Sequence, residues 1–384
     1  MYPERRVSGS RRSPETVEGP AACDALPLES QLSEWSTVRG PVIFFHVGLP
    51  KTGTTSLQSA VLSAYPNAVL KRRVAGDDQE LWREKRGALW RLKQSVLFQD
   101  PDEFWSSKAG RKLAARFDRL FERVADDSGN VLISYEHITF PNAFHHEPEF
   151  YQRYRGDAAP VAAHLAAWLD RLASQDELRV LVTVRRQAPF LGSLYAQWAK
   201  YEDTPGQAAF EAGVRRLLAR PVDHPLSFLN YAKLATDLQE RLGSERTLIL
   251  PMEAMTADDY WRSIAEHAEL DPKALLARTK ALPARNRRSV ESGSWRLHPP
   301  PSLRRRTIDR LPKRTRRRRL AASDYNLPLR AVSKVDMWLH PRRGTISLRT
   351  GLQEKILAYC DEPNRQLATL TRQPLEALGY HEPV

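Results

Sequence analysis

The sequence predicts a three-layer α/β fold in which helices cover both faces of a central parallel sheet. Four short apolar runs have the character of strands that are buried on both faces: 42–45, 131–134, 179–184 and 246–251. Segments with helical periodicity lie between these runs, and strands that alternate with helices favour parallel pairing. The chain of 384 residues is 41% hydrophobic, which is enough to fill the core of such a fold.

The first helix is predicted directly after the first strand. A glycine-rich loop, 48–55, follows that strand, and then Leu57, Ala60, Val61 and Ala64 recur at the spacing of one helical face. Strand, loop and helix therefore follow one another without a gap.

Further helices are predicted from amphipathic patterns at 77–125, 160–173, 189–201 and 228–243. Pro160 suits the first turn of its helix, and Gly243 is a common stop signal at a helix end. The chain thus repeats the order of strand and helix that a parallel sheet requires.

The organisation of the chain is expected to be simple. Residues 1–38 are rich in Arg, Ser, Pro and Glu and show no sustained period, so we expect a flexible N-terminal tail followed by one domain, 39–384. No apolar run approaches the roughly 20 residues of a membrane-spanning helix, and no apolar signal-peptide core follows the charged N-terminus. Only Cys23 and Cys360 occur, which excludes a disulfide scaffold and a cysteine-rich zinc module. We therefore expect a cytoplasmic protein.

The positive charge of the chain is concentrated in one Arg-rich segment, residues 285–319. Its net charge is +12, whereas that of the whole chain is +13, so the remainder is nearly neutral. Three interpretations stay open: a solvated surface stretch, a lid or groove that attracts an anionic acceptor such as an acidic glycan, or attachment to nucleic acid or an anionic membrane. The run RTRRRR has no interleaved aromatic residues, which argues against single-stranded nucleic acid as the partner, and we do not expect nucleic acid to be bound.

The glycine-rich loop has the features of a phosphate-binding loop. It reads GLPKTGTT from Gly48 to Thr55, and the backbone N–H groups of such a loop, with the helix N-terminus, point at an anion. Gly48 and Gly53 fit the nucleotide P-loop GxxxxGK[ST], but the next position is Thr54 instead of Lys. The only lysine, Lys51, precedes the second glycine, which argues against the cation placement of a kinase.

The run HVGLPKTGTTSLQ resembles the 5′-phosphosulfate-binding loop of sulfotransferases that use 3′-phosphoadenosine 5′-phosphosulfate (PAPS), which reads PK[ST]GTT after the first strand. The resemblance, to bacterial members of the family, implies a P-loop-type fold with PAPS as co-substrate. It also implies that Lys51, Thr52, Gly53, Thr54 and Thr55 bind the 5′-phosphosulfate, and that Lys51 stabilises the leaving oxygen. We expect no metal, because a sulfuryl group carries less charge than a phosphoryl group.

A second motif follows the third predicted strand, where Arg185 and Ser193 are eight residues apart. An arginine at the carboxyl end of such a strand faces the crevice where ligands bind, and a charged fork with a hydroxyl suits a phosphate. In the sulfotransferase family, an Arg and a Ser with this spacing hold the 3′-phosphate. The resemblance therefore assigns that role to Arg185 and Ser193, with Arg186 as the alternative at a spacing of seven.

The candidate base for the acceptor follows the second predicted strand, at Glu136 and His137. A positioned base contributes roughly 10²–10⁴-fold to a rate. Cytosolic members of the family carry a catalytic His after this strand, and several carbohydrate-acting members use a Glu. We favour Glu136, because bacterial relatives commonly show Ser-Glu here. His46, inside the first strand, is interpreted as a buried structural histidine, and His145 and His146 lie in a polar loop and are not candidates.

Weaker similarities to the family occur at 248–255, at 284–291, and at Arg343 and Gly344, which resemble a segment that contacts the 3′-phosphate. We expect sulfuryl transfer from PAPS to a hydroxyl or amine of an acceptor that the sequence does not identify, with a glycan or another anionic molecule as one option. Two alternatives stay open. One is a nucleotide kinase or NTPase with a divergent P-loop, and the other is a non-catalytic basic binding protein.

Overall fold

The computed structural model describes the larger part of one compact unit, Gly40–Val384. The described residues are 42–64, 69–70, 88, 91–92, 100–124, 130–136, 164, 167, 177–199, 204–222, 228–281, 293–297 and 344–381. The predicted N-terminal tail, 1–38, and most of the Arg-rich segment, 285–319, lie outside these ranges.

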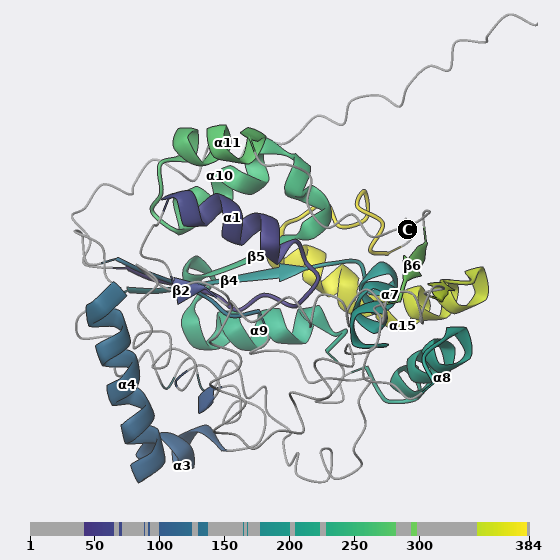
Figure 1. The fold of residues 1–384 in the computed structure, drawn as a ribbon, viewed down its shortest axis with the longest axis horizontal. Helices are drawn as coiled ribbons and strands as arrows, with labels where there is room; N and C mark the ends of the chain where they lie inside the picture. Colours follow the sequence, from purple (N-terminus) through teal and green to yellow (C-terminus); the bar gives the residue numbers. More distant parts are fainter. Residues whose placement is uncertain are drawn as a thin grey trace, which may run out of the picture. The chain divides into compact units, whose positions relative to one another are not determined.

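Five parallel strands form the central sheet, in the order β2-β3-β1-β4-β5 (Figure 1). Their bounds are β1 Val42–His46, β2 Val69–Leu70, β3 Val131–Ser134, β4 Glu177–Val184 and β5 Thr247–Pro251. The four strands predicted from apolar runs are confirmed, and the α/β class with them. Strand β2, with two residues, is too short to show a period in the sequence. Because β1 lies in the middle of the sheet, the loop that follows it emerges between the ends of β3 and β4.

Helices cover both faces of the sheet, which makes three layers. The side chains of β1 alternate between two apolar clusters: Ile43 and Phe45 belong to the larger one and Phe44 to the smaller one. The helices of the larger cluster are α3 Pro101–Ser106, α4 Lys108–Val124, α7 Gln187–Trp198, α8 Gln207–Leu218, α9 Tyr231–Leu242 and α15 Thr350–Thr371. Those of the smaller cluster are α1 Thr54–Ala64, α10 Asp258–His267 and α11 Pro272–Ala281. Figure 1 shows α1, α10 and α11 on one side of the sheet and α4 and α9 on the other.

Two of the predicted helices agree with the structure to within a few residues. The one predicted at 189–201 is α7, which begins at Gln187, and the one at 228–243 is α9, which ends before Gly243. At Gly243 the backbone has a φ of 90°, which favours glycine and stops the helix. Of the helical segment predicted at 77–125, the structure describes α3 and α4, whereas most of 77–99 lies outside the described residues. Of the helix predicted at 160–173, only two residues are described, and both are helical. Among the helices that the structure describes, none is long and apolar enough to span a membrane.

A small antiparallel sheet, β6 Ser294–Arg296 with β7 Thr345–Ser347, packs beside α7 and α8. The indole of Trp295 lies so close to Gly192 of α7 that a Cβ at that glycine would overlap the ring. The pairing of β6 with β7 therefore fixes both flanks of residues 298–343 against the same helix.

A buried arginine ties the start of β4 to the end of α10. Arg179 donates through Nη1 to the main-chain oxygens of Glu266 and His267, at 3.4 and 3.2 Å, and through Nη2 to Glu269 at 2.7 Å. A cation at a helix C-terminus satisfies carbonyls that have no partner within the helix. Arg179 therefore stabilises the amino end of β4, whereas the glycine-rich loop lies at the carboxyl ends of the strands.

Candidate anion-binding site at the carboxyl end of the sheet

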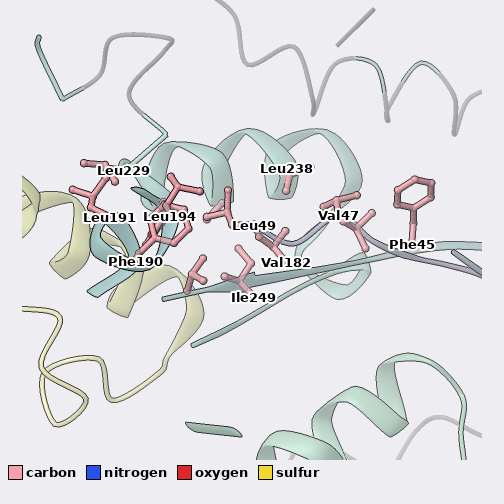
Figure 2. Close-up of a cluster of buried hydrophobic side chains, with 14 of the residues drawn as sticks. Phe45, Val47, Leu49, Val182, Phe190, Leu191, Leu194, Leu229, Leu238 and Ile249 are labelled. Atoms are coloured by element: carbon pink, nitrogen blue, oxygen red, sulfur yellow. The ribbon is translucent and has the colours of Figure 1, made fainter. Parts of the chain in front are cut away.

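The first half of the glycine-rich loop continues strand β1. The backbone N–H groups of Val47 and Leu49 donate to the carbonyls of Leu181 and Thr183 in β4, at 3.0 and 3.3 Å. Figure 2 shows Phe45, Val47 and Leu49 pointing into the same apolar cluster. The loop is therefore anchored by core packing as far as Leu49, and only the residues beyond it turn toward α1.

The second half of the loop turns through two residues with positive φ, Lys51 at 73° and Gly53 at 75°. Such a φ is uncommon for a lysine, and the carbonyl of Lys51 accepts a hydrogen bond of 3.2 Å from Nη1 of Arg185. The carbonyl of Gly53 accepts from the N–H groups of Ser56 and Leu57, at 2.9 and 3.1 Å, which begins α1. The turn is thus held against the end of β4 directly before the N-terminus of a helix.

The three threonine hydroxyls of the loop have different surroundings. The Thr52 hydroxyl is fully buried and donates to the carbonyl of Leu49 at 2.6 Å. The Thr54 hydroxyl donates to the carboxylate of Glu136. Thr55 is exposed, and its hydroxyl has no hydrogen-bond partner among the residues that the structure describes. Of the three, only Thr55 offers its hydroxyl to a ligand, whereas Thr52 and Thr54 offer their backbone N–H groups.

A buried chain of polar side chains lies beneath the loop. Thr52 Oγ1 is 2.6 Å from Thr183 Oγ1, which is 3.2 Å from Nε2 of His46. On the other side of the ring, Nδ1 of His46 is 2.7 Å from Ser134 Oγ, which accepts from Nε2 of Gln58 at 3.0 Å. The chain connects the ends of β1, β3 and β4 with the loop and with α1.

His46 is uncharged within this series of hydrogen-bonded side chains. Its side chain is 1% exposed, and burial lowers its pKa from 6.5 to about 4, although the nearby carboxylate of Glu136 acts in the opposite direction. The interpretation of His46 as a buried structural histidine is therefore confirmed.

We expect the folded chain to lose stability as the pH falls from 6.5 to about 4, because of His46. Over this window the unfolded chain binds a proton on His46 and the folded chain does not, so protonation favours unfolding, by up to about 3 kcal/mol. His46→Gln cannot titrate and should flatten this part of the pH dependence. Urea-unfolding midpoints between pH 7 and pH 4 measure the effect, and equal slopes for the two proteins would contradict it.

Arg185 follows the last residue of β4, and its guanidinium reaches the loop. Besides the bond from Nη1 to Lys51, it has a buried Nε that finds no hydrogen-bond partner in the described part of the chain. Burial lowers the pKa of Arg185, while Glu253, Tyr231 and Tyr380 raise it. A half-buried cation with an unused N–H donor is an arrangement that a bound anion completes.

Ser193 lies further along α7, the helix that follows Arg185. It is half-buried, it makes no hydrogen bond to Arg185, and its hydroxyl has no partner among the described residues. It directly follows Gly192, the residue of α7 that Trp295 of β6 covers. Gly344 directly precedes β7, and its carbonyl accepts from Leu297, which follows β6. Arg343 lies outside the described residues.

Glu136 lies just beyond the end of β3, beside the N-terminus of α1. It is 7% exposed and holds the hydroxyl of Thr54. The structure therefore brings the favoured base into contact with the predicted anion loop, although the two are far apart in sequence. His137, the alternative base, lies outside the described residues.

A clamp that the sequence analysis missed fixes the turn between β4 and α7. Glu253, in the short helix η5 Met252–Thr256 after β5, accepts from the backbone N–H of Arg186 at 3.1 Å and from the hydroxyl of Tyr380 at 2.7 Å. Nε of Arg186 is also 3.7 Å from Glu253. Because Arg186 faces Glu253, Arg185 is the member of the pair that faces the loop. The segment around Glu253 resembles the sulfotransferase family, but nothing near Tyr380 signals its role.

Together these groups form one candidate anion-binding site, because Arg185 touches the loop that leads into the N-terminus of α1. Within the described ranges, no group of three His, Cys, Asp or Glu side chains is placed to hold a metal ion.

Comparison with known proteins finds similar solved structures. No family model matches the chain, and no curated protein matches it. The fold is similar to that of a sulfotransferase from Alicyclobacillus acidocaldarius, with 14% sequence identity and a TM-score of 0.46 over 89% of this chain and 99% of that one. A likeness at this level says nothing about the reaction.

Proposed function

We propose that this chain is a sulfotransferase that takes the sulfuryl group from PAPS and passes it to a hydroxyl or amine of an acceptor. The observation that carries the proposal is the hydrogen bond from Arg185 to the carbonyl of Lys51. It joins two motifs that the resemblance to the sulfotransferase family assigns to the two anionic ends of one nucleotide. The buried, unpartnered Nε of Arg185 supports it, because that donor is suited to an anion.

The residues divide the ligand between two neighbouring strand ends. When bound, PAPS supplies the sulfuryl group on its 5′-phosphate and a second phosphate at its 3′ position. The backbone N–H groups from Thr52 to Thr55 and the hydroxyl of Thr55 would bind the 5′ end, and Lys51 would stabilise the charge on the leaving oxygen. Arg185, together with Ser193, would bind the 3′-phosphate.

Glu136 is the base that we propose for the acceptor. Its carboxylate lies against Thr54, at the end of the loop that would hold the sulfuryl group. An acceptor hydroxyl that approaches this end would meet a carboxylate able to take its proton, which is the geometry general-base catalysis needs. His137 is the alternative.

The kinase alternative is disfavoured by the surroundings of Thr54. A nucleotide P-loop has Lys at this position, where it neutralises the β- and γ-phosphates. Here the side chain is a hydroxyl that donates to a buried carboxylate, so the position adds no positive charge. The cation of this loop is at Lys51, on the other side of Gly53.

Calorimetric titration of the full chain tests the proposal. We expect 3′,5′-diphosphoadenosine to bind without Mg²⁺, roughly tenfold or more tightly than adenosine 5′-phosphate, which lacks the 3′-phosphate. ATP with Mg²⁺ is the parallel titration. Binding of ATP alone, dependent on Mg²⁺, would establish the kinase alternative, and binding of no nucleotide would favour the basic binding protein. A transfer screen with ³⁵S-labelled PAPS against glycans and lipids then identifies the acceptor.

A further inference from the structure

We propose that His46 is a positioning residue: it fixes the shape of the anion loop through a chain of hydrogen bonds that all run in one direction. The role in ligand binding rests on the proposed function, whereas the effect on the loop itself does not. Five side chains form these hydrogen bonds: Gln58, Ser134, His46, Thr183 and Thr52.

The direction of the chain is set at Thr52. Its hydroxyl has one proton, which it donates to the carbonyl of Leu49, because a carbonyl can only accept. In the 2.6 Å contact between Thr52 and Thr183, the Thr183 hydroxyl must therefore be the donor. Thr183 then has no second proton to donate, so its oxygen must accept in the contact with His46. Nε2 of His46 therefore carries a hydrogen.

The directions of the hydrogen bonds on the Nδ1 side of His46 follow from the neutral state of its ring. With its proton on Nε2, His46 can only accept at Nδ1, so Ser134 donates to it across 2.7 Å. The Ser134 oxygen in turn accepts from the side-chain amide of Gln58 at 3.0 Å. Each of the three hydroxyls, on Ser134, Thr183 and Thr52, donates once and accepts once.

Because these side chains are buried, each of them must keep its hydrogen-bond partners. His46, Thr52 and Thr183 are each no more than 1% exposed, so water does not replace a lost partner. Gly48 leaves the necessary room, because a Cβ at this position would overlap both Nε2 of His46 and Oγ1 of Thr183. The first glycine of the loop is thus required by the hydrogen bond between His46 and Thr183. Thr183 in turn contacts Thr52, which is next to Lys51.

Two amide substitutions each preserve one half of the ring's hydrogen bonding. The amide nitrogen of His46→Gln can occupy the place of Nε2 and donate to Thr183, which keeps the side that faces the loop. The amide oxygen of His46→Asn can occupy the place of Nδ1 and accept from Ser134, which keeps only the side away from the loop. Asparagine is also shorter than glutamine and leaves more empty volume at this buried position, so the substitutions at Thr183 separate hydrogen bonding from packing: valine keeps the size of threonine and removes only the hydroxyl.

Two readouts test the proposal. The first is the affinity for 3′,5′-diphosphoadenosine by calorimetry, which we expect to stay within about threefold for His46→Gln and to fall roughly tenfold or more for His46→Asn. The second is amide hydrogen exchange of residues 49–57 without ligand, which should be faster in His46→Asn only. Thr183→Val should behave like His46→Asn, and Thr183→Ser like the unchanged chain, which provides a second matched pair if a substitution at His46 prevents folding.

The outcomes separate this inference from the proposed function. If the unchanged chain binds no 3′,5′-diphosphoadenosine, the proposed function is wrong, and the exchange measurement alone decides on His46. If exchange and affinity are the same for His46→Gln and His46→Asn, and for Thr183→Val and Thr183→Ser, the positioning role is overturned.

Discussion

Arg185→Ala is expected to weaken binding of 3′,5′-diphosphoadenosine by roughly 30-fold or more and to abolish the preference for a nucleotide with a 3′-phosphate. Removal of one partner from a buried, charge-assisted pair costs about 2–5 kcal/mol. Here the lost group is a guanidinium with a buried, unpartnered Nε beside the loop. Calorimetry with 3′,5′-diphosphoadenosine and with adenosine 5′-phosphate measures both the affinity and the preference.

The neighbouring arginine provides the control for this prediction. Arg186→Ala removes the same charge one residue away, but Arg186 faces Glu253, and 46% of its side-chain surface is exposed. Its effect on the preference for the 3′-phosphate should be small, because exposed ion pairs contribute little. If Arg186→Ala abolishes the preference and Arg185→Ala leaves it, the two assignments must be exchanged.

Lys51→Ala is expected to reduce the rate of sulfuryl transfer about 10²–10³-fold, the usual effect of removing a donor that stabilises transition-state charge. Binding of the product nucleotide should change much less, because that charge develops fully only as the oxygen leaves. The measurement is the turnover of ³⁵S-labelled PAPS with an acceptor from the screen, beside calorimetry with 3′,5′-diphosphoadenosine.

The backbone of Lys51 calls for a matched control. Its φ of 73° lies in a region that alanine enters with strain, whereas asparagine adopts it more readily. Lys51→Asn therefore removes the charge with less disturbance of the turn. Turnover that falls equally in both variants assigns the effect to the charge. Turnover that Lys51→Asn retains would show that Lys51 acts through the shape of the loop and not as a cation.

The sequence was most informative where one segment carries its own pattern. The unbroken apolar run of β1, the glycine loop and the periodicity of α1 each predict a local structure, and all three are confirmed. Short elements carry too few residues for a pattern, so β6 and β7, with three residues each, could not be found in this way. The 22-residue helix α15 is not among the predicted helices. It contains Pro363, a residue that usually marks a helix end in sequence.

The site shows the same division between local pattern and long-range contact. The sequence predicts that Arg185 lies at a strand end. Its contact with Lys51 depends on the pairing of β4 with β1, which no local pattern predicts. The inward direction of the Thr52 hydroxyl depends on Thr183, from another strand. The clamp from Tyr380 to Glu253 joins residues 127 positions apart and required the structure.

The pairing of β6 with β7 makes one stretch of the chain separable from the rest. The backbone N–H of Leu297 donates to the carbonyl of Gly344 at 3.0 Å, so the two flanks of residues 298–343 are already at the distance of a strand pair. A tight hairpin turn spans such a gap. Excising residues 298–343 and closing the ends with such a turn would remove nine of the thirteen arginines of the Arg-rich segment 285–319 while the β6–β7 pair keeps its register. The variant would so separate the contribution of the basic stretch from that of the rest of the fold.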